Sequence, residues 1–120
     1  MAQFGWAYVE CTASAGGASV AYAAFSSSFI VSASYDVIGV NCSAGVITAS
    51  LPLVSGLTGG KRFVFKDITG SAGTNAIAIE PSGSDVVDGS TSGVVINVNY
   101  GAVTLAADSV GEYYIIGIRD

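Results

Sequence analysis

The sequence predicts an all-β chain: a single antiparallel β-sandwich or barrel domain, preceded by an extended N-terminal arm. Two observations support this fold class. Short β-branched and aromatic runs recur along the chain with Gly, Asn, Asp and Pro between them, which is typical of sandwiches and barrels. No segment combines a strong helical pattern with capping residues at its ends. The order of the strands is not visible in the pattern, so sandwich and barrel both remain open.

The arm and a connector are predicted in residues 1–34, and the β domain in residues 35–120. The stretch AQFGWAYVE alternates strictly and places Phe4, Trp6 and Tyr8 on one side, which is strand periodicity. We expect these three aromatic side chains to bind a partner by burying apolar area. CTASAGGAS follows and is typical of a flexible connector. In SVAYAAFSSSF the aromatic residues have helix-like spacing, but the run is rich in Ser and uncapped, so a short helix is the less favoured alternative.

From about residue 29 the chain shows a series of strands. FIVSASYDVIGVNC is β-branched and aromatic, and GVITASLPL ends at Pro52, which cannot donate a hydrogen bond to a ladder. In KRFVFKDI, Phe63 and Phe65 are predicted to point inward and to alternate with outward residues. NAIAIEP places Ile77 and Ile79 on one buried face.

Three further segments complete the domain. SDVVDGS is a short strand, and GVVINVNYGAVTLAAD holds one apolar face from Val94 to Tyr100 before a bend near Gly101 and a second strand. GEYYIIGIRD closes the chain as the last strand. No period of 20–50 residues is found that would indicate a solenoid.

Charged residues are scarce in this chain. They make up 11% of it, whereas apolar residues make up 51% and the net charge is −5; a typical soluble domain is about 25% charged. No apolar run approaches the roughly 20 residues that cross a bilayer, so no membrane partner is expected. The acidic balance argues against nucleic-acid binding, which needs clustered Lys and Arg. Either other subunits cover part of the surface, which is the favoured explanation, or Ser, Thr, Gly and Asn solvate it.

Three of the four basic residues, Lys61, Arg62 and Lys66, lie within six positions after a double glycine. The stretch lacks the spacing of a phosphate-binding P-loop and is followed by a strand instead of a helix. It is better interpreted as the strands KRFVFKDI and NAIAIE joined by a Gly-rich turn. We expect the basic cluster to pair with acidic groups on this chain or on a partner subunit.

No catalytic residue, cofactor or metal site is predicted. The chain has no histidine, which excludes Ser-His and Cys-His pairs and argues against zinc and copper. Cys11 and Cys42 are interpreted as buried thiols, because their spacing fits no metal or redox pair. Asp67, Asp85 and Asp88 carry the oxygen ligands that Ca²⁺ prefers. Hydrogen bonding to the backbone of turns is the favoured role for these three side chains.

An ordered set of motifs between Tyr35 and Ile118 resembles a module that recurs in structural proteins of tailed bacteriophages. The motifs are a strand ending in LP, a Gly before a strand ending in KD, the pattern G-x-A-x-x-N-x-I-x-I, a DG turn and an aromatic YYII end. The resemblance implies an all-β module that often forms trimers on the virion surface, either on the tail or as capsid decoration. It implies no catalytic residues.

The favoured function is a non-enzymatic, homotrimeric capsid decoration (cement) protein on the virion. Its partners would be the major capsid protein or neighbouring virion subunits. The alternative is a tail fibre, spike or receptor-binding tip for a host surface ligand, on which Tyr100, Tyr113 and Tyr114 could stack. A carbohydrate-binding or adhesin-like domain of a cell is a third possibility.

Overall fold

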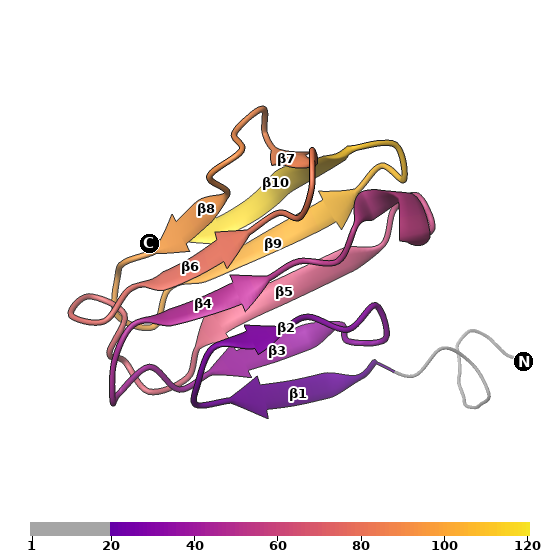
Figure 1. Ribbon diagram of the computed structural model, residues 1–120. Helices are drawn as coiled ribbons and strands as arrows, with labels where there is room; N and C mark the ends of the chain where they lie inside the picture. The colour runs from indigo at the N-terminus through magenta and orange to yellow at the C-terminus, as the bar shows by residue number, and fades with distance from the viewer. Residues whose placement is uncertain (1–19) are drawn as a thin grey trace, which may run out of the picture.

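The computed structural model describes residues 20–120, which form a sandwich of two β-sheets (Figure 1). The all-β prediction is confirmed. Sheet A, with the order β1-β3-β5-β9-β10-β7, contains β1 (Tyr22–Phe25), β3 (Val37–Val40), β5 (Arg62–Asp67), β7 (Val86–Val87), β9 (Ala102–Ala107) and β10 (Glu112–Arg119). Sheet B, with the order β2-β4-β6-β8, contains β2 (Phe29–Ile30), β4 (Ile47–Ser50), β6 (Ile77–Glu80) and β8 (Val94–Ile96).

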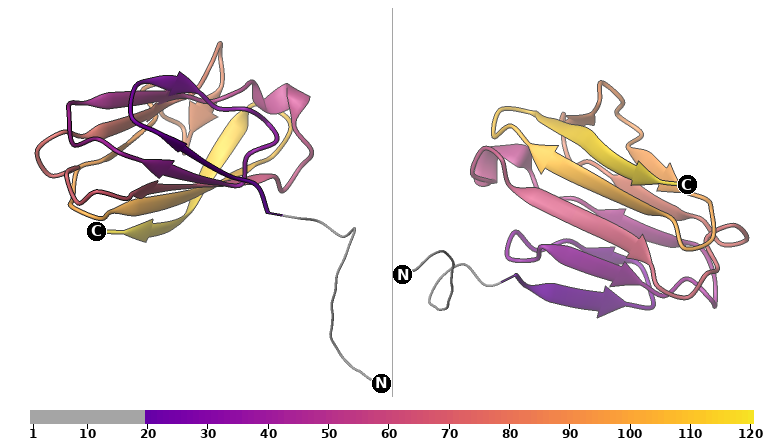
Figure 2. Two further views of the ribbon diagram at one scale, coloured as in Figure 1. Left: turned by 90° about the horizontal axis from the view of Figure 1, so that it is seen from below. Right: turned by 180° about the vertical axis from the view of Figure 1, so that it is seen from behind.

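The chain alternates between the two sheets up to β8, so that β1–β2, β3–β4 and β5–β6 are successive turns of a coil (Figure 2). Strands from successive turns lie side by side in each sheet and run parallel, as β1–β3–β5 in sheet A and β2–β4–β6 in sheet B. β7 and β10 are also parallel, whereas β5–β9, β9–β10 and β6–β8 are antiparallel. The sheets are therefore mixed, and the predicted antiparallel topology is wrong.

The coil escapes detection in the sequence for two reasons. Alternation of apolar and polar residues assigns side chains to one face of a sheet, but it carries no information on the direction of the neighbouring strand. The turns of the coil also differ in length, since Val37 pairs with Tyr22 on one side and with Val64 on the other. The longer turn contains a short 3-10 helix, Val54–Gly56. Unequal turns leave no fixed period.

The core lies between the two sheets. The four side chains predicted as the buried face of β5 and β6 are fully buried: Phe63, Phe65, Ile77 and Ile79. The ring of Tyr113 from β10 lies 6.3 Å from that of Phe63. Its hydroxyl donates a hydrogen bond of 2.6 Å to the carbonyl of Pro52, so the polar end of this buried ring has a partner.

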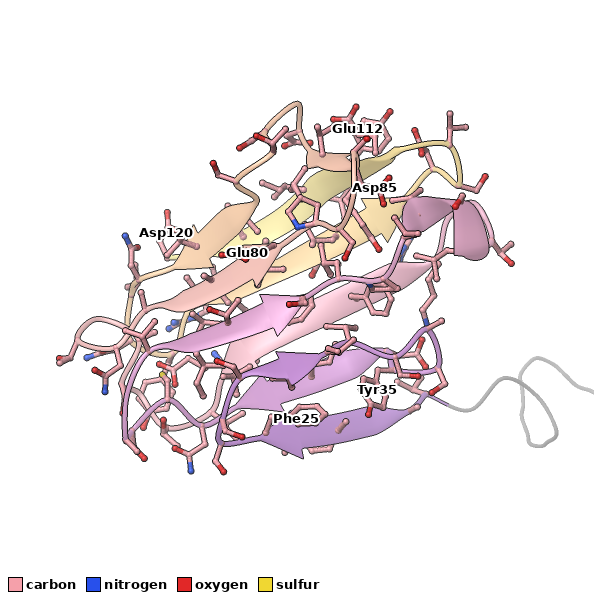
Figure 3. All side chains as sticks on the ribbon, viewed as in Figure 1. Phe25, Tyr35, Glu80, Asp85, Glu112 and Asp120 are labelled. Carbon is pink, nitrogen blue, oxygen red and sulfur yellow. The ribbon has the colours of Figure 1, made fainter. Side chains whose placement is uncertain are left out.

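The sandwich includes β1 and β2, which precede residue 35 and fall in the stretch interpreted from the sequence as a connector. β1 pairs with β3, and β2 pairs with β4. The rings of Phe25 and Phe29 stack with centroids 4.0 Å apart, and Tyr35 lies 5.7 Å from Phe25 (Figure 3). The helix-like spacing of Tyr22, Phe25 and Phe29 therefore belongs to two strands of different sheets, β1 and β2, and not to a helix.

The apolar strand predicted from Val94 to Tyr100 ends at Ile96. Tyr100 has a left-handed backbone with a φ of 60°, and β9 begins two residues later at Ala102. The bend predicted near Gly101 is confirmed. The chain turns earlier than the apolar pattern suggests because the N–H of Tyr100 donates to the buried carboxylate at the end of β5.

Candidate interaction sites

Asp67, the last residue of β5, is fully buried and holds two loops. Its carboxylate accepts hydrogen bonds of 2.9–3.0 Å from the backbone N–H groups of Thr69, Gly70, Ala72 and Tyr100. Burial acts to raise the pKa of Asp67, but these donors outweigh it and lower the pKa from 3.8 to about 2. A buried carboxylate with this many donors is stable without a counter-ion.

The thiol of Cys42 lies in the same buried region, 3.7 Å from Oδ1 of Asp67. Burial first, and then the charge of Asp67, raises the pKa of the Cys42 thiol. A thiol with a raised pKa is a poor nucleophile at neutral pH. The prediction of a buried thiol is thus confirmed for Cys42, whereas Cys11 lies outside the described residues.

The other two candidate calcium ligands also bind the backbone. Oδ2 of Asp85 accepts a hydrogen bond of 2.7 Å from the N–H of Val54, and Oδ1 of Asp88 accepts one of 3.2 Å from the N–H of Ile115. The predicted bonding to the backbone of the residue's own turn is therefore confirmed for Asp67, whereas Asp85 and Asp88 bind backbone groups of distant segments. In the part of the chain that the structure describes, no three His, Cys, Asp or Glu side chains are grouped to hold a metal ion.

The basic cluster is distributed over the start and the outer side of β5. Lys61 forms an ion pair with Asp36, with 2.8 Å between Nζ and Oδ1. Lys66 donates to the backbone carbonyl of Tyr100. Arg62 is exposed and has no ion pair among residues 20–120. Lys61 thus has an acidic partner on its own chain, and pairing of the cluster across an interface stays a prediction.

The outer face of sheet A carries small, apolar and basic side chains, and Arg62, Lys66 and Arg119 all pair with outward residues of β9. The outward residues of β9 are small, and they pair with outward residues of β5: Ala102 with Lys66, Thr104 with Val64, and Ala106 with Arg62. Exposed aromatic side chains flank this strip, with Tyr22 on β1 and Tyr114 on β10. This face therefore combines exposed aromatic side chains with basic ones.

The three tyrosines considered for ligand stacking do not form one platform. Tyr113 is fully buried, whereas Tyr100 is 51% and Tyr114 45% exposed. Side chains of neighbouring residues in a strand point to opposite faces, so the ring of Tyr113 points into the core and the ring of Tyr114 lies on the outer face. Tyr100 precedes β9, while Tyr114 pairs with Ala106 near its other end. The two exposed rings are therefore separated.

A hollow lies at the corner of the sandwich where β8 meets the end of β10. It is small, with a volume of about 30 Å³, and is lined by residues 94–98, 102–103 and 118–120; Figure 3 shows Asp120 beside β8. Ile118 pairs directly with Val103 and so faces the core side of sheet A. Val103 is 2% exposed, but Ile118 is 57% exposed. The core therefore lacks a covering side chain at this corner.

Two strand edges are free beside the hollow. β8 is an edge strand of sheet B and pairs with β6. β7 pairs only with Glu112 and Tyr113 of β10, and Asp88 accepts a hydrogen bond from the N–H of Ile115, so among the described residues that edge of β10 is free only from Ile116 onward. A free edge presents unpaired N–H and C=O groups that can bind another strand.

Sequence reasoning missed this corner. The available signal is the run YYIIGIR, in which apolar residues fall on both faces instead of alternating with polar ones. The ladder between β9 and β10 is also irregular between Ile115 and Gly117. A strand that is apolar on both faces indicates contacts on both faces, and the core of the sandwich accounts for only one of them.

The aromatic residues Phe4, Trp6 and Tyr8 lie outside the described residues, and their role in partner binding stays a prediction. Within residues 20–120 the structure has no helix of the length and apolarity needed to cross a membrane.

Comparison with known proteins does not assign the chain to a family. Its sequence matches no protein-family model and no curated protein. A proposal for its function therefore rests on the motif resemblance and on the surfaces of the sandwich.

Proposed function

We propose that this chain is a non-enzymatic structural protein of a tailed-bacteriophage virion, a homotrimer that binds the head surface and stabilises it. The motif resemblance between Tyr35 and Ile118 supports the virion assignment. One structural observation supports subunit contacts: large apolar side chains are exposed on several sides of the sandwich, including Tyr22, Ile30, Val95, Tyr114, Ile116 and Ile118. Burial of these side chains between subunits would remove apolar area from water and so favour association.

The use of the carboxylates favours a structural role over catalysis. Asp67, Asp85 and Asp88 accept hydrogen bonds from the backbone. Asp108 does the same, with the N–H groups of the β9–β10 turn as donors. A general acid or base must be placed to exchange a proton with a substrate. These four side chains are instead engaged in hydrogen bonds that hold the backbone.

The stabilising mechanism would be burial of apolar surface between subunits and against the capsid. Each Å² of apolar area removed from water contributes roughly 25 cal/mol. The aromatic arm would add about 1.5–3 kcal/mol for each well-buried side chain. Three arms on one trimer would bind with a high effective concentration. Arg62 and Lys66, on the outer face of sheet A, would select acidic partners.

The location of the chain on the virion is the first test. Cryo-electron microscopy of phage particles that carry it should show density on the head surface, and particles without it should break more easily under heat or osmotic shock. Density on the tail alone, together with inhibition of adsorption by the free protein, would instead support the tail fibre or receptor-binding alternative.

The oligomeric state is the second test. Light scattering of the purified full chain should give the mass of a trimer. A monomer at every concentration would contradict the trimer, and it would leave the virion assignment to microscopy.

A further inference from the structure

We propose that two oppositely charged patches on the outer face of sheet A join neighbouring copies of this chain. The basic pair, Lys66 and Arg119, of one copy binds the acidic corner, Asp88, Asp108 and Glu112, of the next copy. Because the contact joins unlike patches, it is heterologous and can close into a ring. The inference rests on the trimer in the proposed function and names the groups that hold its subunits together.

The basic pair lies in one row across three strands. Lys66 of β5 and Arg119 of β10 both pair with Ala102 of β9, so the two long side chains flank a methyl group. Both donate a hydrogen bond to the backbone carbonyl of Tyr100, which places their charged groups at most about 6 Å apart. A carbonyl is neutral, and two like charges this close repel each other. A carboxylate placed between them would relieve that repulsion.

The basic pair is held in place but is not neutralised. Neither cation forms an ion pair with a carboxylate of residues 20–120. Asp67, next to Lys66 in sequence, is fully buried, and its carboxylate accepts the N–H of Tyr100. The ammonium group of Lys66 also lies 5.8 Å from the centroid of the Tyr100 ring. Tyr100 therefore positions the cations and leaves their charge available to a partner.

The acidic corner lies where β7 meets the start of β10. Asp108 accepts hydrogen bonds from the N–H of Glu112 and the hydroxyl of Tyr114. Glu112 accepts one of 2.7 Å from the N–H of Gly89, the residue after Asp88. Desolvation, and after it the charges of Asp108, Glu112 and Asp88, raise the pKa of Tyr114. Three carboxylates therefore gather around one exposed ring, and a carboxylate has acceptor positions for more than one donor.

One copy cannot bring the two patches together. Glu112 and Arg119 are the first and last residues of β10, which at about 3.3 Å per residue puts them about 23 Å apart. Figure 3 shows Glu112 at one end of this strand and Asp120, the residue after Arg119, at the other. The outer face of sheet A is therefore negative at one end and positive at the other, and a second copy can match unlike ends.

Two copies stacked face to face around a two-fold axis through β9 would fit poorly. If the axis runs across the strands, Arg62 of one copy lies over Lys66 of the other, because both are outward residues of β5. If the axis runs along the strands, β5 faces β10 and Lys66 lies over Arg119, since the two share a row. Both stacks place like charges against each other, which disfavours them. A ring contact between the two ends avoids this.

Light scattering of the full chain measures the contact through the mass. Arg119→Glu reverses the charge in the basic pair and should raise the dissociation constant of the trimer at least about tenfold. Glu112→Arg should do the same from the acidic corner. A variant that carries both substitutions restores opposite charges across the contact and should recover the trimer. Added NaCl should weaken the wild-type trimer, because salt screens the attraction.

Arg62→Glu is the matched control. It makes the same charge change on the same face, but Arg62 belongs to neither patch, so the mass should stay that of the trimer. Glu112→Gln is a second test of the acidic corner, because it removes the charge and keeps an acceptor for the N–H of Gly89. It should also raise the dissociation constant. Far-UV circular dichroism and a cooperative unfolding transition verify that each variant folds.

Three results would overturn the proposal. A trimer whose mass does not respond to Arg119→Glu or to either Glu112 variant would place the contact elsewhere and leave the proposed function intact. Single variants that dissociate but are not rescued in combination would mean that the two residues do not face each other. A wild-type protein that is a monomer or a dimer at every concentration would remove the ring and the proposed trimer together.

Discussion

Asp67 accepts a hydrogen bond of 2.9 Å from the backbone N–H of Tyr100, 33 positions away, and so joins the end of β5 to the turn before β9. The same carboxylate binds three N–H groups of the turn that follows β5. One side chain therefore fixes both loops at this end of the sandwich.

We expect Asp67→Ala to lower the free energy of unfolding by about 3–5 kcal/mol, because it leaves several buried donors unpaired. Asp67→Asn keeps one acceptor oxygen and should lose less. Urea denaturation measures both. Glu80→Ala, which removes an exposed carboxylate, is the control and should change stability by no more than about 0.5 kcal/mol. Equal stability of the Asp67→Ala and Glu80→Ala variants would contradict the role of Asp67.

Acid should destabilise the protein partly through Asp67. Its pKa of about 2 in the folded state lies below the ordinary value of 3.8, so the unfolded state takes up the proton first. The resulting stability, about 2 kcal/mol, is fully present above about pH 4 and is lost as the pH falls towards 2.

Denaturation curves between pH 2 and 6 measure this effect as the difference between wild type and Asp67→Asn. The comparison is needed because hydrogen bonds from Val110, Gly111 and Glu112 also lower the pKa of Asp108 to about 2. The variant should show a weaker loss of stability over this range. An identical slope in both proteins would mean that Asp67 does not titrate as described.

Tyr113→Phe should lower the free energy of unfolding by about 1 kcal/mol, since it leaves the carbonyl of Pro52 without its buried donor. The ring itself remains in the core, so the fold should be preserved. Tyr114→Phe is the matched control, because the hydroxyl of Tyr114 makes a longer, exposed bond of 3.3 Å to Asp108. Thermal melts that rank Tyr114→Phe as the less stable variant would refute this assignment.

Gly93→Ala should be much more disruptive than Gly89→Ala. Both glycines have left-handed backbones, with φ of 83° and 80°. A Cβ at Gly93 would overlap the carbonyl of Ile79 in β6, whereas a Cβ at Gly89 would meet open space. Backbone strain alone costs about 1–2 kcal/mol, so Gly89→Ala should remain folded. Gly93→Ala should lose more than that, and similar melting temperatures for the two variants would count against the crowding.

The sequence predicts the core better than it predicts the topology or the site. Strict alternation identifies Phe63 and Phe65 as buried, and turn chemistry identifies the backbone-bonding role of Asp67. Strand direction is invisible, because parallel and antiparallel neighbours require the same alternation. The exposure of Ile118 depends on where β8 ends in space, which no local pattern encodes. The favoured function stays a prediction for the same reason, since it depends on surfaces and partners beyond one chain.

The order of sheet A has a consequence for synthesis on the ribosome. β9 lies between β5 and β10, so a nascent chain that has not yet reached Ala102 leaves one edge of β5 open, together with the apolar rings that the strand carries. Pairing of the parallel strands also closes long loops, and the chain entropy that is lost on closure is offset only after the strands make contact. Folding of the domain therefore waits for its last two strands, and a translational pause before them would prolong the period in which the chain is prone to aggregate.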